Sequence, residues 1–166
     1  SNLTTGGNNT AMGMDALLTA TTQSSNTAVG YQALRATVNA DNTAVGFDAG
    51  KLNSTGTNNT ALGKSAFDAN TTGNANTALG RDALGANTTA DNNTAVGNYC
   101  MGSNTTGESN VAVGSDTMNA NTTGSNNIAI GKSSMAANTT GDYNVAVGYN
   151  ALDANTTADA NTAIGN

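Results

Sequence analysis

The chain has 166 residues, with 5 Lys and Arg, 11 Asp and Glu, no His and a single Cys, and its net charge is −6. This balance argues against a nucleic-acid partner, because phosphate neutralisation requires clustered Lys and Arg. The absence of His removes the commonest general base and metal ligand, and a single Cys cannot form an intrachain disulfide. No apolar run reaches the roughly 20 residues of a membrane span. We therefore expect neither an enzyme nor a cofactor, and no membrane insertion.

One tripeptide, Ala-apolar-Gly, recurs along the whole chain at a nearly constant interval. In chain order its glycines are Gly13, Gly30, Gly46, Gly63, Gly80, Gly97, Gly114, Gly131, Gly148 and Gly165. Every interval is 17 residues except one of 16, which arises from a missing residue in the variant stretch 35–40. A fixed period of this kind predicts a repeat architecture.

Each repeat reads approximately Asn-Thr-Ala-Val-Gly-x-x-Ala-Leu-x-Ala-Asn-Thr-Thr-Gly-x-x. Seventeen residues are too few for the two-helix repeats, and Gly, Thr and Asn are weak helix formers. The apolar positions fit two short extended segments per repeat, separated by corners where Gly and Asn adopt positive φ. The sequence predicts an all-β fold, a parallel β-roll or β-solenoid of ten 17-residue coils, as one repeat domain over residues 1–166.

Alternation along the first segment separates its residues into two faces. Three repeats replace Thr by Val111, Ile128 or Val145, so we expect the Thr and Val columns to lie inside the coil. The opposite face then carries a small-residue column that permits close backbone approach. We expect this column to be a contact between chains, formed by Ala28, Ala44, Ala61, Ala78, Ala95, Ala112, Ala129 and Ala146.

The repeat Asn-Thr-Ala-Val-Gly-Tyr-Gln-Ala-Leu at residues 26–34, and its relative at 144–152, resemble the head repeats of trimeric autotransporter adhesins. They are also similar to the repeats of bacteriophage tail-fibre shafts. The resemblance implies a homotrimer of left-handed parallel β-rolls on a cell or virion surface, which acts as a stiff spacer and adhesive surface. The partners it implies are further copies of this chain and a host-surface glycan or protein receptor, in an extracellular location.

Two other functions stay open. The chain starts within a repeat and stops at Asn-Thr-Ala-Ile-Gly-Asn, so we expect it either to belong to a longer fibre or to stack on its neighbours. Head-to-tail stacking of uncapped coils would give a self-assembling extracellular filament. An ice-binding solenoid requires a flat Thr face on a stable monomer, but adjacent pairs such as Thr71-Thr72 can point only one Thr outward.

Carboxylates recur in two groups. One follows the repeat glycine, at Asp15, Asp48, Asp82 and Asp116, and the other lies between repeats, at Asp41, Asp91, Glu108, Asp142 and Asp159. Paired carboxylates can act as glycosidic acid and base or bind calcium. The first group is interrupted by Gln32, Ser65, Tyr99 and Ser133, and we interpret both groups as solvated corners that favour solubility.

The Asn-Thr-Thr tripeptides are acceptor sequences for N-glycosylation in a secreted eukaryotic protein. Their asparagines are Asn70, Asn87, Asn104, Asn121, Asn138 and Asn155. The interpretation we favour is structural: Asn fills a turn, and stacked asparagines form ladders of amides. Glycosylation stays open as the alternative.

Aromatic residues are few, and they lie at or near the expected turns: Tyr31, Phe47, Tyr99, Tyr143 and Tyr149. We favour local turn packing for them over contacts with sugar rings. Cys100 takes a place that is Ala in most repeats, which predicts a buried thiol. Because no His is present to activate it, we expect no nucleophilic role.

Overall fold

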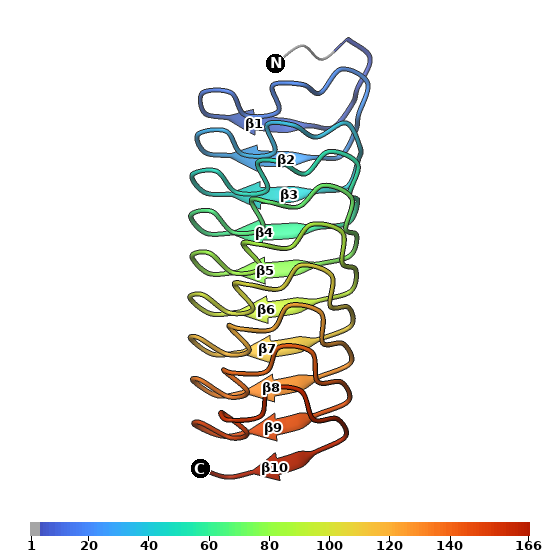
Figure 1. Cartoon of the computed structure of the whole chain (residues 1–166). Coiled ribbons are helices and arrows are strands. Elements are labelled where there is room, and N and C mark those ends of the chain that lie inside the picture. The colour runs from blue at the N-terminus through green and yellow to red at the C-terminus, as the bar shows by residue number, and fades with distance from the viewer. Residues whose placement is uncertain (1–3) are drawn as a thin grey trace.

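The computed structural model describes residues 4–166 and shows a parallel β-solenoid (Figure 1). One strand per repeat contributes to a single sheet in which sequence neighbours pair in parallel. The strands are β1 Thr10–Met12, β2 Thr27–Val29, β3 Thr43–Val45, β4 Thr60–Leu62, β5 Thr77–Leu79, β6 Thr94–Val96, β7 Val111–Val113, β8 Ile128–Ile130, β9 Val145–Val147 and β10 Thr162–Ile164. The predicted fold class is confirmed, and the array runs through the described residues; residues 1–3 of the predicted domain lie outside them.

Only one of the two expected extended segments per repeat is a strand. The second, which holds pairs such as Ala33-Leu34, is a run of turns whose residues alternate into the left-handed region. In the fifth coil, for example, φ is 54° at Asp82 and 48° at Leu84. This segment still bonds to its neighbours, since Leu84 N–H donates to the Cys100 carbonyl at 3.0 Å. Hydrogen bonding between coils therefore continues beyond the sheet.

The repeat glycine ends each strand for two physical reasons. At Gly97 φ is 143°, which side chains other than Gly rarely adopt, and a Cβ there would lie 2.2 Å from the carbonyl oxygen of Gly114. The glycines of successive coils thus stack backbone on backbone. This close approach explains why the position is Gly in all ten repeats.

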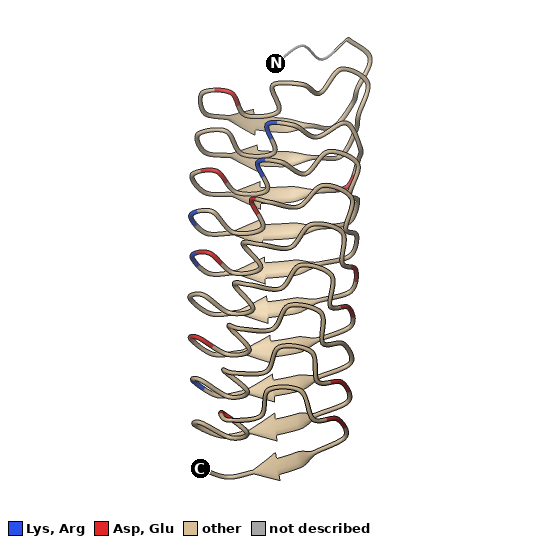
Figure 2. Ribbon diagram, in the orientation of Figure 1, with Lys and Arg blue, Asp and Glu red and all other residues tan. Residues whose placement is uncertain are grey.

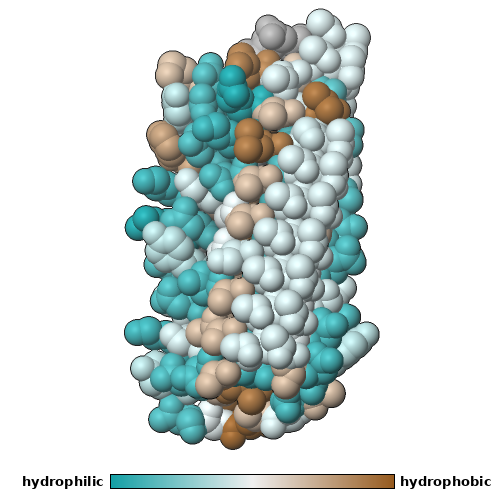
Figure 3. Space-filling model, in the orientation of Figure 1, coloured by the Kyte–Doolittle hydropathy of each residue, from teal (hydrophilic) through white to brown (hydrophobic). Residues whose placement is uncertain are grey.

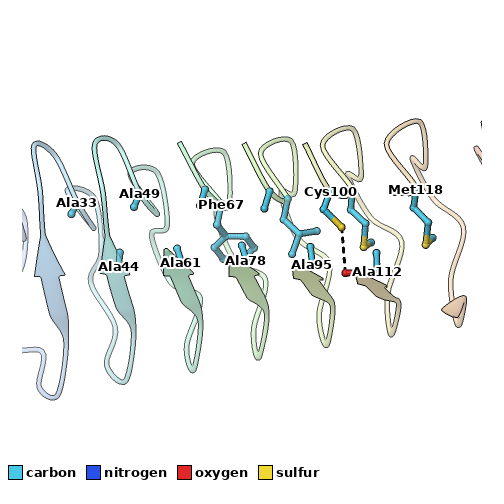
Figure 4. Close-up of a cluster of buried hydrophobic side chains, with 14 of the residues drawn as sticks. Ala33, Ala44, Ala49, Ala61, Phe67, Ala78, Ala95, Cys100, Ala112 and Met118 are labelled. Atoms are coloured by element: carbon cyan, nitrogen blue, oxygen red, sulfur yellow. Dashed lines mark hydrogen bonds between the residues drawn. The ribbon is translucent and has the colours of Figure 1, made fainter. Parts of the chain in front are cut away.

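The Ala column lies inside the coil, so the predicted assignment of the two faces is wrong. Ala28, Ala44, Ala61, Ala78, Ala95, Ala112, Ala129 and Ala146 are at most 2% exposed in the single chain and belong to its core. Larger side chains fill the interior from the returning loops, and Figure 4 shows Phe67, Cys100 and Met118 extending toward the strand alanines. The narrow space between strand and loop admits only a methyl group on the strand side.

Two ladders of buried asparagines connect the coils. The first ladder consists of the Asn that precedes each strand: its Oδ1 accepts the backbone N–H of the same Asn one coil on, as between Asn93 and Asn110 at 3.0 Å. The second ladder consists of the Asn of each Asn-Thr-Thr, and its amides bond to one another, as from Asn104 to Asn87 at 3.1 Å. The predicted amide ladder is confirmed, and it satisfies backbone groups that the interior would otherwise leave without partners.

The second ladder begins at Asn53 and not at the first coil. Ala20 and Thr37 occupy the corresponding places in the preceding coils. Thr37 is fully buried, and its hydroxyl has no hydrogen-bond partner. Thr37 lies within the one 16-residue interval, between Gly30 and Gly46.

Candidate functional site

The side of the sheet that points away from the coil interior carries two columns of side chains, one from the first and one from the third residue of each strand. We call this side the outward sheet face. The outward positions of β1–β10 hold only Thr, Val, Leu, Ile and Met. Seven of the thirteen exposed large hydrophobic residues in the described part of the chain lie there: Met12, Leu62, Leu79, Val111, Ile128, Ile130 and Ile164. Exposed Leu62 and Leu79, at 47% and 40%, are the residues that the face prediction placed inside.

Charged residues lie away from this face. Figure 2 shows Lys, Arg, Asp and Glu on the loops, while the strands carry none. Figure 3 shows the same regularity on the surface, where side chains of similar hydropathy form stripes along the long axis, bordered by hydrophilic side chains. The strands therefore form a face without charged side chains along the whole sheet.

Three of the five carboxylates of the second group accept hydrogen bonds from neighbouring coils. Asp91 Oδ1 accepts the backbone N–H of Asn74 at 2.6 Å, and Asp142 and Asp159 make the equivalent bonds to Ser125 and Asp142 at 2.6 and 2.8 Å. Among residues 4–166, no group of three or more His, Cys, Asp or Glu side chains is placed to hold a metal ion. These carboxylates thus serve the corner structure.

The Asn-Thr-Thr asparagines do not fit the glycosylation alternative. Asn70, Asn87, Asn104, Asn121 and Asn138 are fully buried, and the side-chain nitrogens of these residues and of the partly buried Asn155 donate within the second ladder. A glycan on any of these nitrogens would replace ladder hydrogen bonds. The folded chain therefore does not present them for modification.

The aromatic residues divide between packed and exposed positions. Tyr31 and Phe47 stack with ring centroids 5.0 Å apart, and the Lys64 ammonium lies 5.9 Å from the Phe47 centroid. Tyr143 and Tyr149 are 64% and 53% exposed. Tyr99 also packs locally, against Arg81, whose guanidinium lies 5.1 Å from its ring centroid. Local packing is thus confirmed for Tyr31, Phe47 and Tyr99, and no such contact holds Tyr143 or Tyr149 among the ring contacts of residues 4–166.

Cys100 is buried as predicted, and its Sγ donates to the carbonyl of Ala112 at 3.3 Å (Figure 4). Burial raises the pKa of the thiol to about 12. The thiolate required for nucleophilic attack is therefore scarce at neutral pH.

A hollow of about 330 Å³ lies in the loops that follow β4 to β7. Its lining includes Asp68, Asp82, Gly85, Tyr99, Gly102, Ser103 and Asn119. Burial raises the pKa of Asp68, and the negative charges of Asp82 and Asp48 raise it further. The hollow thus brings two mutually repelling carboxylates together with a phenol, a hydroxyl and an amide.

Arg81 holds two of these lining residues in place. Its Nε lies 2.9 Å from Asp82 Oδ2, its Nη2 donates to the Tyr99 hydroxyl at 2.7 Å, and its guanidinium lies 5.1 Å from the Tyr99 ring centroid. One side chain therefore fixes both a carboxylate and an aromatic wall.

Sequence reasoning missed this hollow, although the period contains a signal for it. Asp68, Gly85, Gly102 and Asn119 are spaced by 17 residues and so occupy one column of the solenoid. In this variable column two glycines, Gly85 and Gly102, stand between two polar residues, Asp68 and Asn119. The prediction rests on the columns that are constant from repeat to repeat.

The described residues contain no helix that could cross a membrane. Comparison of the chain with protein-family models, with curated proteins and with solved structures found no match in any of the three.

Proposed function

We propose that this chain is a structural and adhesive segment of an extracellular or virion fibre, in which three copies associate through the outward sheet face. The observation that carries the proposal is this face: an uncharged strip, continuous over ten strands, with exposed Leu, Ile, Val and Met. The number three follows from the resemblance of the repeats to those of trimeric adhesin heads.

The charge distribution favours contact between copies at this face. A net charge of −6 opposes association wherever acidic corners meet. On the outward sheet face two copies meet without charged side chains, and only there does burial remove a continuous row of large apolar groups from water. The same periodicity on every copy lets the rows of neighbouring chains interlock in register.

Association through this face differs from association through the Ala column. The Ala column is already covered by the loops of its own chain. An interface formed by the outward sheet face leaves that core untouched. It also keeps the acidic loops on the outside of the fibre, where they maintain solubility.

Solution mass by light scattering tests this proposal. We expect the chain to have the mass of three copies, and Leu62→Glu combined with Leu79→Glu to yield folded monomers, because two carboxylates per chain would enter the contact. The matched control is Thr72→Glu with Thr89→Glu, on exposed Thr of a loop face, which should leave the assembly unchanged. Circular dichroism verifies that each variant is folded.

Three results would overturn the proposal. The unaltered chain could be monomeric, which would redirect attention to the ice-binding alternative. It could form long filaments in negative-stain images, which would favour head-to-tail stacking. Finally, the Leu62 and Leu79 variant could retain three copies, which would place the contact elsewhere.

A further inference from the structure

We propose that the hollow formed by Asp68, Asp82, Gly85, Tyr99, Gly102 and Asn119 binds one uncharged pyranose ring, a neutral hexose or deoxyhexose unit of a glycan. The inference rests on the adhesive part of the proposed function, for which it names the ligand class and the residues. It does not depend on how many copies associate.

Two adjacent glycines create the hollow without being required by the coil. Gly85 and Gly102 are absent from the residues with positive φ, and a Cβ on Gly85 would have its nearest contact at 3.3 Å, with the Asp82 carbonyl oxygen. The same column carries larger side chains in other coils: Leu18, Arg35, Lys51 and Asp153. Since the coil tolerates side chains at this position, the space over Gly85 is a local addition to the repeat; over Gly102 the Asn119 side chain closes the hollow, with its Oδ1 2.8 Å from where a Cβ would lie.

One wall of the hollow, formed by Asp82 and Tyr99, is ordered by contacts within the chain. The guanidinium of Arg81 bridges the Asp82 carboxylate and the Tyr99 hydroxyl, at 2.9 and 2.7 Å, and it covers part of the Tyr99 ring. The backbone beneath is held by hydrogen bonds between coils, such as Ala86 N–H to the Gly102 carbonyl at 3.1 Å. Groups ordered in this way lose little conformational freedom on binding, which favours affinity for a small ligand.

The lining groups match a ring that bears several hydroxyls. Carboxylates accept hydrogen bonds from hydroxyl donors, the Asn119 amide both donates and accepts, and the Tyr99 ring offers an aromatic surface to C–H groups. Hydroxyl donors placed near Asp68 and Asp82 also stabilise two carboxylates that repel each other. The volume of about 330 Å³ is at the small end of ligand sites, which fits one ring and not an extended chain.

The charge of the hollow decides which sugars enter it. An acidic sugar would bring a further anion toward Asp68 and Asp82, while the nearby Arg81 is already paired with Asp82. A divalent cation would find two carboxylates here, whereas protein calcium sites supply about six to eight oxygens, and among residues 4–166 no group of three or more Asp, Glu, His or Cys is placed to hold a metal ion. The neutral pyranose is the ligand that the donors and acceptors satisfy without adding a charge.

The test is an amide chemical-shift titration of the full chain with methyl α-D-glucopyranoside, methyl α-D-mannopyranoside and methyl α-L-fucopyranoside. N-acetylneuraminic acid and calcium chloride are the charged probes. We expect at least one neutral glycoside to shift the amides of Gly85, Gly102 and Asn119 in a saturable manner. Gly85→Leu, which fills the hollow, should weaken this binding at least tenfold, and Asp68→Asn should weaken it with the shape of the site preserved.

Ala136→Leu is the matched control, because it places the same side chain in the same column one coil beyond Asn119. It should bind like the unaltered chain. The inference is overturned if no neutral glycoside shifts these amides, if Gly85→Leu binds as well as Ala136→Leu, or if either charged probe binds more tightly than every glycoside. Each outcome is separate from the solution mass, so loss of the three-copy assembly would not be mistaken for loss of the sugar site.

Discussion

Removing one amide from the first Asn ladder should destabilise the whole solenoid. Asn93 is fully buried; its Oδ1 accepts the backbone N–H of Asn110 at 3.0 Å and the side-chain nitrogen of Asn110 at 3.1 Å. Its own Nδ2 donates to the Gly107 carbonyl at 2.8 Å. Asn93→Ala deletes all three bonds and leaves a small cavity between coils.

The three losses are not equal. Gly107 still accepts from Asn104 at 2.9 Å, and the side chain of Asn110 still donates to Gly124 at 2.9 Å. The backbone N–H of Asn110 is the group that loses its partner, at a cost of about 1–3 kcal/mol, and the other two bonds contribute about 0.5–1.5 kcal/mol each. We expect Asn93→Ala to lower the free energy of unfolding by about 4 kcal/mol.

Urea unfolding followed by circular dichroism at one protein concentration measures this difference. Asn98→Ala is the matched control, because Asn98 is exposed and its side chain has no part in either ladder. Amide hydrogen exchange adds a local measurement: the Asn110 N–H should exchange much faster in Asn93→Ala. Equal stability of the Asn93 and Asn98 variants would refute the reasoning, because it would mean that the ladder contributes nothing beyond the backbone bonds.

Three further changes have defined expectations. Gly97→Ala should lower the free energy of unfolding by about 3 kcal/mol or more, because at a φ of 143° its Cβ would lie 2.2 Å from the Gly114 oxygen. Gly85→Ala is the control and should be neutral or slightly stabilising. Equal losses of unfolding free energy in the two variants, measured by urea unfolding, would contradict this. Thr37→Val should raise the melting temperature, with a gain of about 1 kcal/mol from removing a buried hydroxyl that has no partner; a less stable variant would show that the hydroxyl is satisfied. The thiol of Cys100 titrates near 9 when unfolded and near 12 when folded, so stability is lost as pH rises above 9. The advantage of the natural chain over Cys100→Ala should shrink by about 1 kcal/mol between pH 9 and about 10, and parallel pH profiles would argue against it.

The period and the place of each strand could be predicted from the sequence, because Gly97 and its equivalents have a steric requirement that no other residue meets. The direction of the faces could not. Thr94 and Val96 alternate with Ala95, and alternation separates two faces without saying which one is inside. Side-chain size determines which face is buried, and it does so in the opposite sense to the prediction. Leu84 and Met101 fill the interior from the loops, so the strand has room inside for nothing larger than Ala95.

The second Asn ladder could be predicted from the sequence for a related reason. A buried amide that bonds to its copy in the next coil must recur along the stack, as the Asn-Thr-Thr residues Asn87, Asn104 and Asn121 do. The ladder of the Asn before each strand was not predicted, although that Asn recurs in all ten repeats. The hollow has the opposite character, because it exists only where the repeat varies. Its residues form no sequence motif. Only their 17-residue spacing, which puts Asp68, Gly85, Gly102 and Asn119 in one column, indicates that they are neighbours.

The bonds between coils also determine how the molecule would respond to force. Tension applied at the two ends of the stack loads the coils in series, while the sheet bonds, the first Asn ladder and, from Asn53 onward, the second Asn ladder resist in parallel. Any coil at a free end of a stack has a neighbour on one side only and should detach first. Each detached coil exchanges a stack height of about 4.8 Å for an extended length of roughly 60 Å. Under load the solenoid would therefore lengthen by nearly the same amount with each coil that detaches, and each detachment would dissipate mechanical work.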